Sequence, residues 1–236
     1  MAIDIALLVV WGLVTWCVSG EGAFGAALNC LAIVTGGLIA MNYFEPLATF
    51  GQSYILTGSG WPFYWDTIAL VGLFAASVTG LRFLFDYFTP LRFELVSLGE
   101  EIGRWFFGAF AGYATMAILL TALHTAPFPR EFMGFTAERK NLFNLMAPDR
   151  QWLGFTQFVS ESVFAQSTPQ IFDGPVSDFI QNPGDTNRNK VWSSFPIRYA
   201  TRREQYEGGA FTAPPPVASP PSGGNTPNNS GRAAGF

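Results

Sequence analysis

The residues of this chain that are able to do chemistry are few and far apart. There is one histidine, His124, and there are two cysteines, Cys17 and Cys30, so a zinc site built from four Cys and His ligands is excluded. No Ser, Cys or acidic side chain lies near His124 in the sequence to complete a nucleophile and base arrangement. We therefore predict no catalytic residue, no cofactor-binding residue and no metal ligand, and we expect a protein that is not an enzyme.

One short motif matches a nucleotide-binding pattern by its letters alone. Residues 20–25 read Gly-Glu-Gly-Ala-Phe-Gly, which fits G-x-G-x-x-G. A dinucleotide site would require a preceding strand and a βαβ unit around the motif. The motif instead separates two long apolar runs. We interpret it as a tight hairpin in which glycine accepts a positive φ.

The composition indicates a membrane protein. Only 13% of the 236 residues are charged and 49% are hydrophobic, whereas about a quarter of a typical globular chain is charged. The net charge of −4, without a Lys/Arg cluster, excludes a nucleic-acid-binding protein. Two cysteines are too few for a small secreted module held together by disulfides.

Four apolar runs are candidates for membrane-spanning helices. A hydrocarbon core about 30 Å thick requires about 20 mostly apolar residues. The predicted spans lie at about 5–20, 22–43, 66–85 and 104–126. The third has the shortest uncharged part and reaches the required length only if Arg82 extends its charged end to the headgroups. The expected fold is an all-α integral membrane protein, a four-transmembrane-helix bundle in residues 1–126.

Between the second and third spans, residues 45–63 predict a short interfacial helix. Its apolar face repeats with helical spacing and would lie on the membrane surface. The residues of that face are Leu47, Phe50, Tyr54 and Ile55.

After the fourth span the composition becomes mixed, and residues 127–206 predict a membrane-proximal segment that is partly helical and partly irregular. Its best helix follows Pro148, with Asp149 as the N-cap, and a shorter helix is expected at 137–146. The apolar face of the longer helix would be Trp152, Phe155, Val159 and Val163, packed either on the protein's own bundle or on a partner. Residues 207–236 are rich in Pro and Gly and predict a disordered tail.

Two sets of residues mark how the spans are expected to pack and where they end. Small residues at every fourth position let helices approach closely in lipid. The helix-packing candidates are Gly36, Gly72, Gly80, Gly108 and Gly112. Packing within one bundle is the favoured interpretation, and homodimerisation through one stripe is the alternative. The candidate membrane-boundary charges are Asp4, Glu21, Asp66, Glu101 and Arg104.

The first 125 residues resemble the colicin V production (CvpA) family. The resemblance is carried by Asp4, by the glycine-rich hairpin at 20–25 and by the acidic and glycine-rich run at 101–112. Residues 125–206 are similar to extensions in planctomycete-type members of that family. The resemblance implies a bacterial inner-membrane protein of four helices that serves colicin V production or export and, more generally, the cell envelope. Toxin biosynthetic process is the label that accompanies the family, and no catalytic residue is carried over from it.

Two functions remain open at this point. The first is a non-enzymatic export accessory or scaffold, in which the bundle anchors residues 127–206 for an envelope protein partner. The alternative is a small transporter or channel component that works as a homo-oligomer. Both place the chain in the lipid bilayer.

Overall fold

The computed structural model describes residues 2–55, 62–89, 97–129, 132–135, 142–143, 145–163, 195–196 and 198–200. Within these ranges the regular structure is helical, with two short turns closed by isolated bridges. The helices are α1 (Ala2–Ser19), α2 (Gly22–Tyr54), α3 (Pro62–Phe88), α4 (Ser97–Thr125) and α5 (Pro148–Ser162). The predicted tail at 207–236 lies outside the described residues.

Four of the helices, α1 to α4, are long and apolar enough to cross a membrane, and the chain is a multi-pass membrane protein. The doubtful third run is part of α3, which extends beyond Arg82 to Phe88 and has ample length. The prediction of four spans is therefore confirmed.

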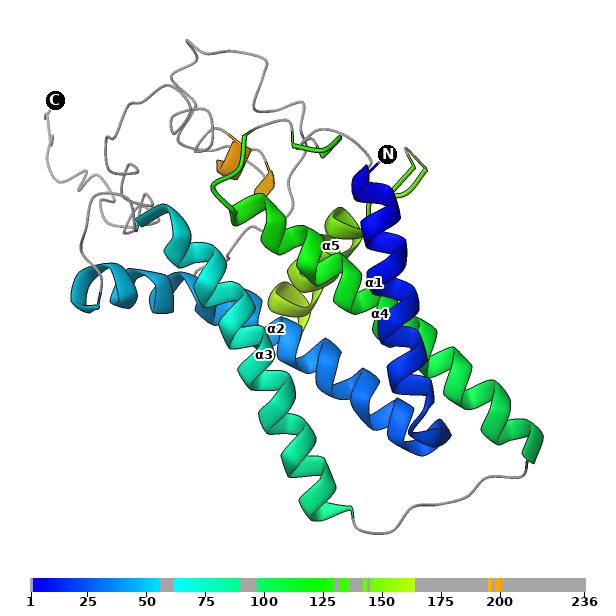
Figure 1. Cartoon of the computed structure of the whole chain (residues 1–236). Helices are drawn as coiled ribbons and strands as arrows, with labels where there is room; N and C mark the ends of the chain where they lie inside the picture. Colours follow the sequence, from blue (N-terminus) through cyan, green and yellow to red (C-terminus); the bar gives the residue numbers. More distant parts are fainter. Residues whose placement is uncertain are drawn as a thin grey trace, which may run out of the picture.

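Consecutive spans run in opposite directions (Figure 1). The start of α2 lies beside the start of α4, because a Cβ on Gly22 would come within 2.7 Å of Glu100. We call this the hairpin end. At the opposite end, Thr125 at the close of α4 donates a hydrogen bond to Thr67 near the start of α3 (3.2 Å). The N-terminus lies at this second end, which we call the cap end.

The connection between α1 and α2 is the tight hairpin that the glycine motif predicted. The backbone N–H of Glu21 donates to the carbonyl oxygen of Val18 (3.2 Å), and Gly22 has a φ of 82°. Residues with a Cβ rarely adopt a positive φ. Glycine at position 22 therefore allows α2 to begin directly after the turn.

The prediction of a separate interfacial helix at 45–63 was wrong. Residues 45–54 continue α2, which passes through Pro46 and ends at Tyr54. One side of this extension packs on α3, since a Cβ on Gly51 would come within 2.5 Å of the Trp65 ring. The predicted apolar face lies on the other side and is exposed; its residues are Leu47, Phe50, Tyr54 and Ile55.

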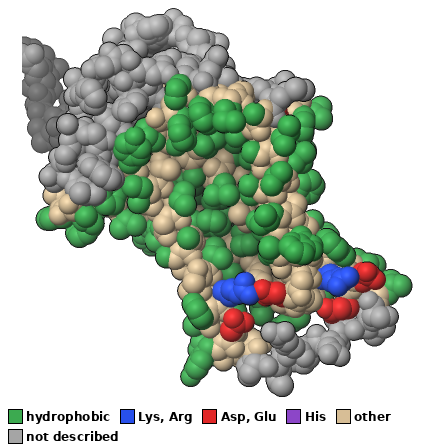
Figure 2. Space-filling model, in the orientation of Figure 1, with side chains coloured by type: hydrophobic (Ala, Val, Ile, Leu, Met, Phe, Trp, Pro, Cys, Tyr) green, Lys and Arg blue, Asp and Glu red, His purple; other side chains and the backbone are tan. Residues whose placement is uncertain are grey.

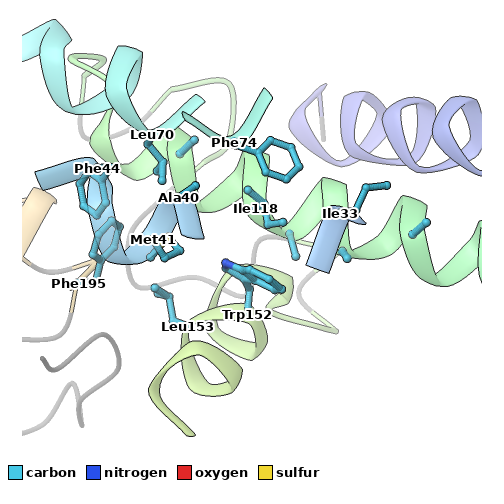
Figure 3. Packing of buried hydrophobic residues seen from close by; sticks show 14 of the residues in the cluster. Ile33, Ala40, Met41, Phe44, Leu70, Phe74, Ile118, Trp152, Leu153 and Phe195 are labelled. Atoms are coloured by element: carbon cyan, nitrogen blue, oxygen red, sulfur yellow. The ribbon is translucent and has the colours of Figure 1, made fainter. Parts of the chain in front are cut away.

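The main core joins α2 to α3, α4 and α5 (Figure 3). Alanine and glycine on α2 bring the neighbouring helices close, and larger side chains fill the remaining space. In Figure 3 the ring of Trp152 and the side chain of Leu153, both from α5, point toward α2. The large members of this core are Met41, Phe44, Leu70, Phe74, Ile118, Trp152, Leu153 and Phe195.

Helix α5 begins at Pro148, where a helix was predicted, but its N-cap and its buried face differ from the prediction. Its N-cap is Ala147, and Asp149 lies in the first turn instead of serving as the cap. Trp152 and Val159 are buried on the protein's own bundle, whereas Phe155 and Val163 are exposed. The bundle side of α5 therefore carries Leu153 and Thr156 in place of these two residues.

The shorter helix expected at 137–146 is not present in its described part. Leu142 and Met146 form an isolated antiparallel bridge that closes a turn. Residues 137–141 and 144 lie outside the described residues. A turn replaces the helix here because Phe143 has a φ of 49°, which interrupts right-handed helix geometry.

Candidate functional site

A completely buried polar contact joins α4 to α5. Nε2 of His124 lies 2.8 Å from Oδ2 of Asp149, and both side chains are completely buried. The His124 ring also packs on the ring of Phe135, with 4.7 Å between centroids. The only histidine of the chain therefore ties the end of the fourth span to the first turn of α5.

Further polar groups along α5 are satisfied close to this pair. The hydroxyl of Tyr113 on α4 donates to Oε1 of Gln151. The hydroxyl of Thr156 donates to the carbonyl oxygen of Trp152 within α5 (2.9 Å). Helix α5 is thus held to the spans by hydrogen bonds as well as by apolar contact.

A His–Asp pair orients the general base in many hydrolases, but such a site also needs a nucleophile and access for the substrate. Here both side chains are sealed from solvent, and the nearby hydroxyl of Thr121 donates to the carbonyl oxygen of Ala117 (2.9 Å). No group of three or more His, Cys, Asp or Glu side chains that could hold a metal occurs among the residues that the structure describes. The pair forms a fixed connection between α4 and α5.

Asp4, predicted as a boundary charge, is buried at the cap end and organises the chain that follows α4. Its Oδ1 accepts a hydrogen bond from the backbone N–H of Phe143 (2.8 Å). Beside it, the backbone N–H of Ile3 donates to the carbonyl oxygen of Met133 (3.4 Å). The first turn of α1 therefore fixes two separate turns of the membrane-proximal segment.

These two turns present a group of exposed apolar side chains, which we call the apolar cap. The rings of Phe128 and Phe132 stack with 4.6 Å between centroids, and Phe132 and Phe135 form a bridge that closes the first turn. The exposed members that define the apolar cap are Phe128, Met133, Phe143, Leu145 and Met146.

The hairpin end carries three further boundary charges, Glu21, Glu101 and Arg104. Glu21 accepts hydrogen bonds from Arg82 on α3 and from Nδ2 of Asn29 (2.6 Å). Arg104 pairs with Glu101 at 3.3 Å. Figure 2 shows basic and acidic side chains gathered at the lower end of the face in view, next to a broad hydrophobic surface without charge.

A further carboxylate at the hairpin end was missed by the sequence analysis. Oε1 of Glu100 accepts a hydrogen bond from the backbone N–H of Ala23 (2.6 Å), in the first turn of α2. A negative charge at a helix N-terminus is favourable because the first backbone N–H groups there lack partners.

Asp66, the remaining boundary candidate, lies one turn inside α3 and is buried. It sits at the cap end, next in sequence to the Thr67 that contacts α4. Asp66 therefore lies near the end of the span, as predicted, with its side chain buried in the protein.

The five helix-packing glycines divide into two groups. A Cβ on Gly36 would meet Val78 of α3 at 2.8 Å. On α4, a Cβ on Gly108 or Gly112 would come within 2.9 Å or 2.7 Å of backbone carbonyl oxygens of α1. Gly72 and Gly80 have no close neighbour within the described part of the chain, since a Cβ there would meet no atom within 4 Å.

Another close approach escaped the sequence analysis. A Cβ on Gly37 would lie 2.6 Å from the ring of Trp152 and 2.5 Å from Ile118. The four-residue spacing of small residues pointed to Gly36 alone. In the structure Gly36 contacts α3, and the adjacent Gly37 contacts α4 and α5.

No family model matches this chain, and neither a curated protein nor a solved structure is detectably similar to it.

Proposed function

We propose that this multi-pass membrane protein is a non-enzymatic scaffold of the bacterial inner membrane, an envelope or export accessory of the colicin V production type. Its spans hold the membrane-proximal segment so that a partner protein binds there. The observation that carries the proposal is the apolar cap, whose turns are fixed by Asp4 and Ile3 at the beginning of α1.

An apolar surface of this kind supports a binding role. Leu145 is 78% and Met133 57% exposed, although both lie beyond the end of α4, where the spanning part of the chain has finished. Large apolar side chains that are ordered yet uncovered are typical of interaction sites. The sealed His124–Asp149 pair supports the non-enzymatic part of the proposal, because it fixes the segment to the bundle without being open to a substrate.

A photo-crosslinking amino acid at position 145 tests this function in native membranes. We expect Leu145 to give a discrete adduct with a second, different protein, because the apolar cap would be covered by that partner. Phe106 is the matched control: it is 63% exposed on α4 but belongs to a span, and we expect only lipid adducts there. The adduct masses are read by immunoblot and the partner is identified by mass spectrometry.

The other outcomes are equally informative. Lipid adducts alone at position 145 would contradict the scaffold function and leave the cap as a membrane-surface contact. An adduct of two copies of this chain would replace the scaffold with the homo-oligomer, the arrangement that a small transporter or channel component requires.

A further inference from the structure

We propose that α5 is a fifth intramembrane element, a helix that enters the bilayer from the cap end without crossing it, with Phe155 and Phe158 in contact with lipid acyl chains. This inference goes beyond the scaffold function, which concerns the apolar cap.

The depth of α5 follows from its contacts with α2 and α4. At the hairpin end, Arg104 marks one boundary of the membrane, and about 21 Å of helix rise separates it from Ile118. Trp152 packs against Gly37 at a position where Ile118 also packs. Because the hydrocarbon core is about 30 Å thick, Trp152 lies inside it, and tilting of the spans only moves the ring closer to the bilayer centre.

A second route to the same depth runs along α2. Gly37 lies about 22 Å of helix rise beyond Gly22 at the hairpin. Helices α2 and α4 run parallel, since Ala23 lies against Gly103 and Gly37 against Ile118. Both helices therefore place α5 at the same level.

The described residues at 195–196 and 198–200, which follow α5, lie at the cap end. The ring of Phe195 contacts Phe44 with 6.1 Å between centroids. Arg198 pairs with Glu45 at 3.1 Å. Phe44 and Glu45 lie well past Gly37 on α2, in the direction of the cap end, so the chain returns to the side from which α5 entered.

Polar groups at this depth must be satisfied within the protein, because lipid offers no hydrogen bonds. The pairing of Asp149 with His124 and of Gln151 with Tyr113 meets this requirement for these four side chains, whereas Nε1 of Trp152 and Oγ of Ser160 are buried without a hydrogen-bond partner in the described chain. The outward side of α5 is different: Phe155 and Phe158 are 41% and 61% exposed. Leu31 on α2 and Phe110 on α4, which belong to spans packed against α5, are exposed in the same way, as is expected of side chains that face lipid.

Spin labels on the full chain in phosphatidylcholine vesicles test this depth. In a background with Cys17→Ala and Cys30→Ala, a nitroxide is attached at Phe158→Cys and, independently, at Phe155→Cys. Leu13→Cys on α1 serves as the lipid-facing reference and Leu145→Cys as the reference beyond the spans. Collision rates with oxygen, which concentrates in acyl chains, and with a water-soluble nickel chelate are compared.

We expect both α5 labels to behave like Leu13→Cys, with high oxygen accessibility and nickel accessibility several-fold below that of Leu145→Cys. Nickel accessibility equal to that of Leu145→Cys would overturn the proposal, because α5 would then face water. Low accessibility to both reagents would also overturn it, since protein and not lipid would cover the face. Agreement between the two positions guards against a local effect of either substitution.

Discussion

Gly112→Leu is expected to destabilise the protein more than any other single apolar substitution in α4. The new Cβ would lie 2.7 Å from the carbonyl oxygen of Trp11, a backbone atom that cannot rotate away. Overpacking typically costs about 1–3 kcal/mol and more where the backbone must shift, so we expect a loss of about 3 kcal/mol. Unfolding of the purified protein in mixed detergent, followed by circular dichroism, measures this change.

Gly72→Leu is the matched control, because it places the same side chain at a glycine of another span that has no described neighbour within 4 Å. The free energy of unfolding should change by no more than about 0.5 kcal/mol there. Equal losses at Gly112 and Gly72 would show that α1 does not approach α4 in the way described.

The second large effect concerns the buried pair between α4 and α5. Asp149→Ala or His124→Leu removes one partner and leaves the other in a site without solvent. Breaking such a pair from one side costs about 3–5 kcal/mol. The partly exposed pair of Arg104 and Glu101 is the control, and Arg104→Ala should cost less than about 1 kcal/mol.

The double variant with both substitutions separates a true pair from two independent losses. If His124 and Asp149 stabilise each other, the double variant is less destabilised than the sum of the two single variants. Additive losses within experimental error would mean that the contact contributes nothing of its own.

The spans could be predicted because crossing a membrane depends on the length and composition of one continuous segment. Even the short third run is part of a full-length helix. Arg82 donates a hydrogen bond to Glu21 at the hairpin end, and the apolar residues after Arg82 remain helical. The hairpin at Gly22 could also be predicted from a local signal, because a tight turn between two long helices requires a residue with positive φ.

The contacts between segments could not be read in this way. His124 and Asp149 lie 25 positions apart, and only the turns between them bring the two side chains together. The spacing of small residues did not reveal which face of α3 has a neighbour, so Gly72 was grouped with Gly112. Periodicity in α5 indicated an amphipathic helix and placed Phe155 on its buried face, whereas the structure buries Leu153 and exposes Phe155.

Residues 45–54 illustrate how tertiary packing overrides a local signal. The helical spacing of Leu47, Phe50 and Tyr54 indicated a surface helix separate from the second span. The helix nevertheless continues, since Gly51 receives the Trp65 ring and Glu45 pairs with Arg198 on the same side of the molecule. None of these partners is close in sequence.

Compartment-specific reporters at three positions test the account most directly, because it rests on four spans and on an α5 that does not cross. Reporters are fused at Met1, inserted at Phe93 between α3 and α4, and fused after Tyr206. We expect the first and third to report the same compartment and the second to report the opposite one. Opposite compartments for Met1 and Tyr206 would contradict the account, because either α3 would fail to cross or the segment containing α5 would pass through the membrane.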